Sequence, residues 1–239
     1  MRATDFEFRN RFWLFGLLFG ASFWAYAIDH QNAGEALARL LTRDTDFHTA
    51  AGQRVLHGVF WAGALLVGLA ALLRTWATAY LDSDRVHDAN LRTESVVADG
   101  PYRHVRNPLY FANLLIAVGV GLAASRLGMA LLVVGHVVYL SRLIGREEAE
   151  LLASQGETYR RYLAAVPGLW PALRPRLPAS GLAPRWGQAV VGEVFFWLIF
   201  VGMALFAATL KAWLLPVVTV VGMAFYLGMF AVLKRRRAT

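Results

Sequence analysis

Apolar residues form six long runs along the chain, and polar residues gather between these runs. A helix needs about 20 mainly apolar residues to cross the hydrocarbon core of a bilayer. The pattern therefore predicts an all-α fold, a polytopic membrane helix bundle with about six transmembrane helices. The six runs are roughly 12–28, 55–73, 108–125, 127–141, 189–210 and 212–233.

The polar segments between the runs also carry structural signals. Only Ser125 and Arg126 separate the third and fourth runs, which predicts a tight antiparallel hairpin. The fourth run is short, so we expect its helix to tilt little or to continue past Arg142. A run of prolines between 167 and 184 predicts an extended connector. Apolar positions at helical spacing predict two surface helices, marked by Leu37, Leu40 and Leu41 and by Tyr159, Tyr162, Leu163 and Val166.

Composition excludes an ordinary soluble domain, because 57% of the 239 residues are hydrophobic, only 17% are charged and the mean hydropathy is +0.45. The net charge of +8 raises the alternative of nucleic-acid binding. However, most lysines and arginines fall in alternate segments, which lie on one side of the predicted membrane. Because positive residues collect on the cytoplasmic side, we expect no nucleic acid, both termini in the cytoplasm and contact with anionic lipids.

Several other functions are excluded or disfavoured. The chain has no cysteine, so it has no disulfide or thiol chemistry. The six histidines lack HxxxH or HExxH spacing, and we expect no metal site. The first run, with Ala25-Tyr26-Ala27 near its end, also resembles a signal peptide. Because this run is rich in Trp and Phe and further spans follow, we favour an uncleaved first span.

The stretch GPYRHVRNPLYFAN, residues 100–113, places polar chemistry at the start of the third run. Pro108 suits the first turn of a helix, and Asn107 can cap it. The free amides and dipole of a helix start favour an anion. Interfacial anchoring is the alternative role. Further donors and ring faces, which could hold a carboxylate and a flat heterocycle, come from Tyr102, Arg103, His104, Arg106 and Tyr110.

A second polar stretch, GREEAELLASQGETYRRYLAAVPGLWP, begins at Gly145 as the fourth run ends. Glu147 and Glu148 lie at a depth where a carboxylate can reach water. Because adjacent helical residues point about 100° apart, only one of the two can face a given pocket. The alternative is a solvated helix with an Arg146–Glu150 pair.

Together the two stretches resemble a family of integral-membrane methyltransferases. GPYRHVRNPLY is similar to the GPYRxxRHPxYxG motif of the isoprenylcysteine carboxyl methyltransferases and phospholipid N-methyltransferases. REEAELLASQGETYRRYLAAVPGLWP resembles the EExxLxxxFGxxYxxYxxxVPxxxP element that follows it. The resemblance covers about residues 96–171. Two positions depart from the pattern, since Asn107 replaces the usual His and Ala112 the Gly.

The resemblance implies S-adenosylmethionine as methyl donor, bound on the cytoplasmic side, and a lipophilic acceptor that enters from the bilayer. The acceptor would be an isoprenylcysteine carboxylate, a lipid amine, a small thiol or another hydrophobe. The predicted donor site consists of Tyr102, Arg103, His104, Arg106, Asn107, Pro108, Tyr110, Glu147 and Glu148.

A methyl transfer needs positioning of the reactants more than acid–base chemistry. A carboxylate acceptor needs only a cation to hold it, whereas an amine acceptor needs a base. Arg142 and Arg146 are candidates for a planar, bidentate carboxylate clamp, with anchoring at the inside face as their alternative role. We therefore predict Arg142, Arg146 and Glu147 as catalytic residues.

The expected organisation is a methyltransferase-like core over residues 1–187, with catalytic elements at about 96–171, and a C-terminal transmembrane hairpin with a basic tail over 188–239. Two alternatives use a similar region. A membrane sterol or steroid reductase would carry a related Arg-His-Pro-x-Tyr stretch and bind NADPH. A non-catalytic membrane carrier would keep only the fold.

Overall fold

The computed structural model describes residues 2–42, 46–87 and 98–238, together with side chains other than those of 82–87 and 230–238. This part of the chain is helical and contains no strand. Val96 and Val97, the first residues of the predicted catalytic region, lie outside it. In chain order the elements are α1 Asp5–Arg9, α2 Arg11–Trp24, η1 Ala25–Ala27, α3 Ala33–Thr42, α4 Ala50–His87, η2 Gly100–Arg103, α5 Pro108–Gly121, α6 Arg126–Ala165, α7 Trp186–Gly192, α8 Val194–Thr209 and α9 Leu214–Ala238.

The six apolar runs all fall on helical segments, the fifth of them on both α7 and α8, so the predicted helical membrane fold is confirmed. By length and composition α4, over Ala50–Leu81, and α6 are able to cross a membrane. Helices α7 and α8, bent by 60° at the break between them, would together form a third span. Helix α5 and Leu214–Met229 of α9 are shorter apolar helices. The number of crossings and the orientation of the termini stay predictions.

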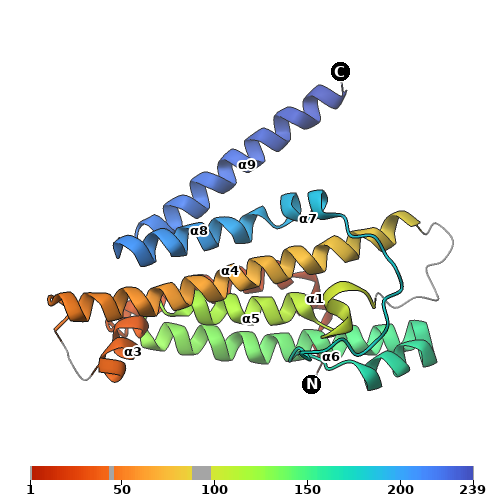
Figure 1. Ribbon diagram of the computed structural model, residues 1–239, viewed down its shortest axis with the longest axis horizontal. Helices are drawn as coiled ribbons and strands as arrows, with labels where there is room; N and C mark the ends of the chain where they lie inside the picture. Colours follow the sequence, from red (N-terminus) through yellow and green to blue (C-terminus); the bar gives the residue numbers. More distant parts are fainter. Residues whose placement is uncertain (1, 43–45, 88–97, 239) are drawn as a thin grey trace.

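Helix α4 forms the centre of the bundle (Figure 1), where it packs against α5 on one side and α8 on another. Glycines allow α4 and α5 to approach closely. A Cβ on Gly63 would lie 2.9 Å from the Gly119 oxygen, and a Cβ on Gly119 would lie 2.6 Å from the Gly63 oxygen. Small side chains in contact let two helices meet along their backbones. This contact fixes α5, and hence its polar N-terminus, against α4.

Helices α5 and α6 form the expected tight hairpin, in which Ser125 caps α6 by accepting a 3.0 Å hydrogen bond from the Gly128 amide. Helix α6 continues far past Arg142, as its short apolar run predicted. It contains one break at Gly156, where φ is 58° and ψ is −125°. A residue with a Cβ rarely adopts a positive φ. The break redirects the last turns of α6 toward η2.

The two predicted surface helices form, and they differ in what they bury. In α3 the buried residues are alanine and glycine, while Leu40 and Leu41 are exposed. In the last turns of α6, Tyr159 and Tyr162 are buried with Val166. The expected connector follows α6 without helix from 166 to 185 and runs along one end of the bundle to α7 (Figure 1).

The C-terminal hairpin, defined as α7, α8 and α9, lies on the face of α4 opposite α5 and α6 (Figure 1). The predicted division at residue 187 falls in the first turn of α7. Helix α9 contacts α8 and extends away from the rest of the bundle. The division of the chain into two units stays a prediction.

Candidate active site

The two polar stretches singled out in the sequence meet at one end of the bundle. The main chain joins them directly. The Arg106 amide donates a 2.9 Å hydrogen bond to the Pro167 oxygen, and the Asn107 amide donates a 3.2 Å bond to the Gly168 oxygen. The start of α5 and the end of α6 are therefore held as one structure.

Arg106 is the main link between the two stretches. Its Nε donates a 2.9 Å bond to Glu148 Oε1, and its Nη1 donates to the carbonyl oxygens of Leu163, at 2.8 Å, and Val166, at 2.5 Å. The last carbonyls of a helix have no partner within it. The guanidinium thus caps α6 while it holds a carboxylate of the same helix, and both charged side chains are mostly buried.

Asn107 binds the same carboxylate. It is the N-cap residue of α5, as expected, but its side chain makes no bond to the helix amides. Instead its Nδ2 lies 3.0 Å from the Gly168 oxygen and 3.4 Å from Glu148 Oε1. A histidine, which the family motif has here, would present different donors to Glu148. The departure at Asn107 therefore changes the partners of a candidate site carboxylate.

Glu147 points to a different partner from its neighbour. The Tyr110 hydroxyl, one turn into α5, donates a 2.5 Å hydrogen bond to Glu147 Oε1. Pro108 occupies the first turn of α5, as predicted, and is buried. The structure thus brings five predicted residues together, which we call the site core: Arg106, Asn107, Tyr110, Glu147 and Glu148.

Tyr102, Arg103 and His104 bind the end of α6 and the connector rather than the site core. The Tyr102 oxygen accepts a 2.9 Å bond from the Tyr162 hydroxyl. Arg103 Nε donates a 2.8 Å bond to the Leu177 oxygen, and His104 Nδ1 lies 2.8 Å from the Ala172 oxygen. These contacts fold the connector over the η2 end of the bundle. The predicted role of the three residues in the donor pocket stays a prediction.

Asp99, which the sequence did not single out, also holds the connector in place. This buried carboxylate accepts 2.9 Å hydrogen bonds from the amides of Ser180 and Leu182 and a bond from the Ser180 hydroxyl. Burial raises the pKa of Asp99, but the hydrogen bonds outweigh burial and lower the pKa overall. The sequence signal was weak: an acid directly before Gly-Pro.

Arg142 and Arg146 lie in a separate cluster with α1. Arg142 donates to both oxygens of Glu7, at 3.0 and 2.8 Å, in a bidentate pair. Arg146 pairs with Asp5 at 2.7 Å and also forms the expected pair with Glu150 at 2.7 Å. Hydrogen bonding from Arg142 is the largest cause that lowers the pKa of Glu7 to about 2. These ion pairs connect the two arginines to α1 and to Glu150, not to the carboxylates of the site core.

The site core fits the chemical groups of S-adenosylmethionine. Glu147 and Glu148 offer acceptors for an ammonium or ribose hydroxyls, and the first turn of α5 offers amides for a carboxylate. Within the described part of the chain, Gln155 Oε1 is a buried oxygen without a hydrogen-bond partner. It lies two turns after Glu148 on α6, where it could accept a bond from a ligand amine.

Comparison with known proteins supports the same region. Residues 59–155 match the phospholipid methyltransferase family. The chain is 28% identical over 111 residues to the cobalt-zinc-cadmium resistance protein CzcN of Cupriavidus metallidurans, over 46% of this chain and 48% of that protein. The chain thus spans about half the length of the curated relative it matches. No solved structure matches. The resemblance expected from the two motifs is therefore confirmed at the level of the family, since residues 59–155 carry the sequence pattern of the phospholipid methyltransferase family, and residues 156–171 of the second motif lie beyond the match.

Proposed function

We propose that this protein is an integral-membrane methyltransferase that uses S-adenosylmethionine to methylate a lipophilic acceptor, an isoprenylcysteine-like carboxylate or a lipid amine. One observation carries the proposal. Arg106 and Asn107 on one motif half bind Glu148 on the other, and Tyr110 binds Glu147. The family match and the apolar helices support the same reaction class and a membrane location.

When bound, the donor would supply an electrophilic methyl group on a sulfonium. The residues of the chain would do the positioning. Glu147 and Glu148 would hold the positively charged and hydroxyl-bearing parts of the donor, and the amides at the α5 start would hold its carboxylate. Arg106 would fix Glu148, and Tyr110 would fix Glu147. The remaining predicted residues, Tyr102, Arg103, His104, Asn107 and Pro108, would shape the wall of this pocket.

The acceptor decides what else is needed. For a lipid amine, Glu147 Oε is the proposed atom that takes up the proton. For a carboxylate, Arg142 and Arg146 are the proposed clamp, and the bidentate Arg142–Glu7 pair supports this chemistry because it already holds a carboxylate in that geometry. In this second case α1 would have to move aside. We propose that the site faces the cytoplasm, as the distribution of basic residues predicts.

Calorimetric titration of the detergent-purified protein with S-adenosylhomocysteine, beside NADPH, tests the proposal. The product is used because it binds without turnover. Saturable binding of S-adenosylhomocysteine without binding of NADPH supports the methyltransferase. Binding of NADPH alone would assign the protein to the reductases. If the folded protein bound neither, the carrier reading would replace the proposal.

A further inference from the structure

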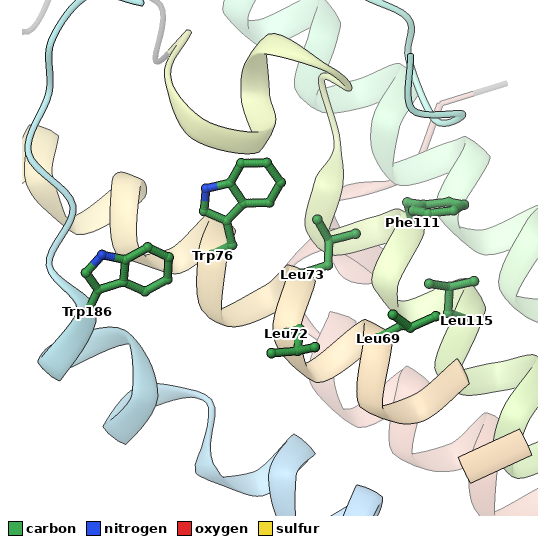
Figure 2. A pocket seen from close by; sticks show the side chains of 7 residues that line it. All are labelled: Leu69, Leu72, Leu73, Trp76, Phe111, Leu115 and Trp186. Atoms are coloured by element: carbon green, nitrogen blue, oxygen red, sulfur yellow. The ribbon is translucent and has the colours of Figure 1, made fainter. Parts of the chain in front are cut away.

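An apolar groove lies between α4, α5 and the start of α7 (Figure 2). Its volume is about 590 Å³, within the range of small-molecule sites. Leucine, phenylalanine and tryptophan side chains alone line it, so it offers hydrocarbon and indole surfaces and almost no polar atoms. The lining residues are Leu69, Leu72, Leu73, Trp76, Phe111, Leu115 and Trp186.

One end of the groove lies against the two motif stretches. Trp76 lies against His104 of the motif, with 6.0 Å between the ring centroids. The ring of Phe111 lies 5.7 Å from that of Trp170, which belongs to the second motif stretch. The sides of the groove are open, since Leu69 and Leu72 are more than half exposed on a helix able to cross a membrane. The groove thus connects a lipid-facing helix surface with His104 and Trp170 of the two motif stretches.

Trp186 is the groove residue that comes from the C-terminal hairpin, beyond the segment that matches the family. In Figure 2 its indole faces the groove from the side opposite Phe111 and Leu115. The side chain is 49% exposed. An indole that served only to pack α7 would be expected to bury more of its surface.

A buried ion pair holds α7 in this place. Glu193, at the break between α7 and α8, accepts bonds from Arg74 Nε at 2.6 Å, Arg74 Nη2 at 3.3 Å and the Thr78 hydroxyl at 2.7 Å. Arg74 Nη1 donates a 2.8 Å bond to Asn113 of α5. The pair therefore ties the 60° bend of the hairpin to both α4 and α5.

We propose that the C-terminal hairpin completes the acceptor site. Trp186 closes one side of the groove, the groove holds the hydrocarbon chain of the acceptor, and the Arg74–Glu193 pair keeps Trp186 in position. This inference rests on the proposed function. A wholly apolar lining on a helix able to cross a membrane suits a hydrocarbon chain, and the motif stretches at the end of the groove would receive the polar end of the same molecule. Trp186 is thus a specificity-determining residue, and Arg74 and Glu193 are positioning residues.

The test uses the full chain in phosphatidylcholine liposomes with a single-chain phosphocholine whose hexadecyl chain carries a diazirine. After photolysis, adducts are mapped by mass spectrometry. Labelling of Trp76 and Trp186 is expected to saturate, whereas labelling of exposed Phe225 on α9 should rise in proportion to the added lipid. Competition by N-acetyl-S-farnesylcysteine or by lysophosphatidylethanolamine distinguishes a prenyl from an acyl source of the chain. Labelling of the groove that never saturates would overturn the proposal.

Variants separate the roles of the residues. Trp186→Ala is expected to raise the half-saturating concentration about tenfold, and Trp186→Phe by less. Trp213→Ala is the matched control, an exposed tryptophan of the same hairpin outside the groove, and should change nothing. Glu193→Gln should act in the same direction as Trp186→Ala. Equal half-saturating lipid concentrations in the parent and Trp186→Ala proteins would reject the role of Trp186.

Binding of S-adenosylhomocysteine, measured on the same preparations, keeps the two proposals apart. Trp186→Ala should leave this affinity unchanged, which also shows that the variant is folded. Saturable labelling without S-adenosylhomocysteine binding would reject the methyltransferase and keep a chain-binding groove. Binding of S-adenosylhomocysteine without saturable labelling would keep the methyltransferase and reject the groove.

Discussion

Two buried arginine–glutamate pairs stand at the same end of the molecule and differ in how completely their partners are arranged. Arg74–Glu193 is bidentate, and Asn113, Thr78 and the Phe196 ring, 3.7 Å from the guanidinium carbon, complete its surroundings. Arg106–Glu148 is a single contact through Nε, and Nη1 of Arg106 donates to the carbonyl oxygens of Leu163 and Val166. Among the described residues, Glu193 therefore keeps less acceptor capacity than Glu148.

The difference indicates separate roles. Both pairs have opposite charges within 3 Å and little exposure, so neither distance nor burial distinguishes them. What distinguishes them is the remaining hydrogen-bonding capacity. A carboxylate ion accepts about four hydrogen bonds. Glu193 uses three from side chains, while Glu148 uses two, from Arg106 and Asn107. We therefore expect the first pair to stabilise the fold and the second to serve a ligand.

The largest expected effect is on stability, in Glu193→Gln. The substitution leaves Arg74 buried without a charged partner, which costs about 3–5 kcal/mol. Thermal unfolding in detergent should show a clear fall in Tm, while the affinity for S-adenosylhomocysteine stays within about twofold of the parent. Replacing both residues by glutamine should recover part of the loss. An unchanged Tm in the single variant would remove the distinction between the two pairs.

The second effect is on donor binding. Glu148→Gln and Glu147→Gln should each weaken S-adenosylhomocysteine by about tenfold or more, because a charge-assisted hydrogen bond contributes about 1.5–3 kcal/mol. Calorimetry measures this change. Glu150→Gln, an exposed carboxylate one turn further along α6 and paired with Arg146, is the control. Equal affinities in all three variants would place the donor elsewhere.

A third effect is smaller and depends on pH. Because the pKa of Glu7 falls from 4.5 to about 2 in the folded chain, its pair with Arg142 is fully present above pH 4.5. This contribution to stability is lost as the pH falls toward about 2. The Tm of Glu7→Gln should therefore approach that of the parent protein in acid. A constant difference in Tm from pH 6 to pH 2 would contradict the assigned pKa.

The smallest effect is expected for Tyr110→Phe. The substitution removes a charge-assisted hydrogen bond to Glu147, worth about 1.5–3 kcal/mol, but it keeps the ring and leaves Glu147 itself to hold the donor. Affinity for S-adenosylhomocysteine should fall a few-fold, less than in Glu147→Gln. Tyr26→Phe, which removes a hydroxyl bonded to the Ala123 oxygen far along the chain from the site core, should leave the affinity unchanged. A larger loss in Tyr110→Phe than in Glu147→Gln would reverse their assigned order.

Much of the fold could be predicted because hydrophobic burial in a membrane produces long apolar runs. The limits of the helices could not. Helix α4 continues to His87 although its apolar run ends near Leu73. The apolar run marks the part of a helix that lies in apolar surroundings, whereas the backbone hydrogen bonds of the helix continue into polar residues. Helix α6 extends past its apolar run for the same reason.

The site could be predicted only in part. The motif spacing singled out Arg106 and both glutamates, whose role in binding a donor stays a prediction, and Glu147 and Glu148 have different partners, as side chains about 100° apart should. Pairings with distant residues were missed. Arg142 binds Glu7, 135 positions away in the chain, and Glu193 binds Arg74, 119 positions away. Single charges beside apolar runs gave no indication of these partners, because the partners depend on which helices pack together.

The break at Gly156 has a consequence for chirality. Its φ and ψ of 58° and −125° are the mirror image of the extended conformation that L-residues prefer. A Cβ there would meet no other atom within 4 Å. The requirement for glycine is therefore a matter of handedness alone and not of space. A D-alanine placed there by semisynthesis would favour this backbone conformation, and it would restrict the unfolded chain more than glycine does.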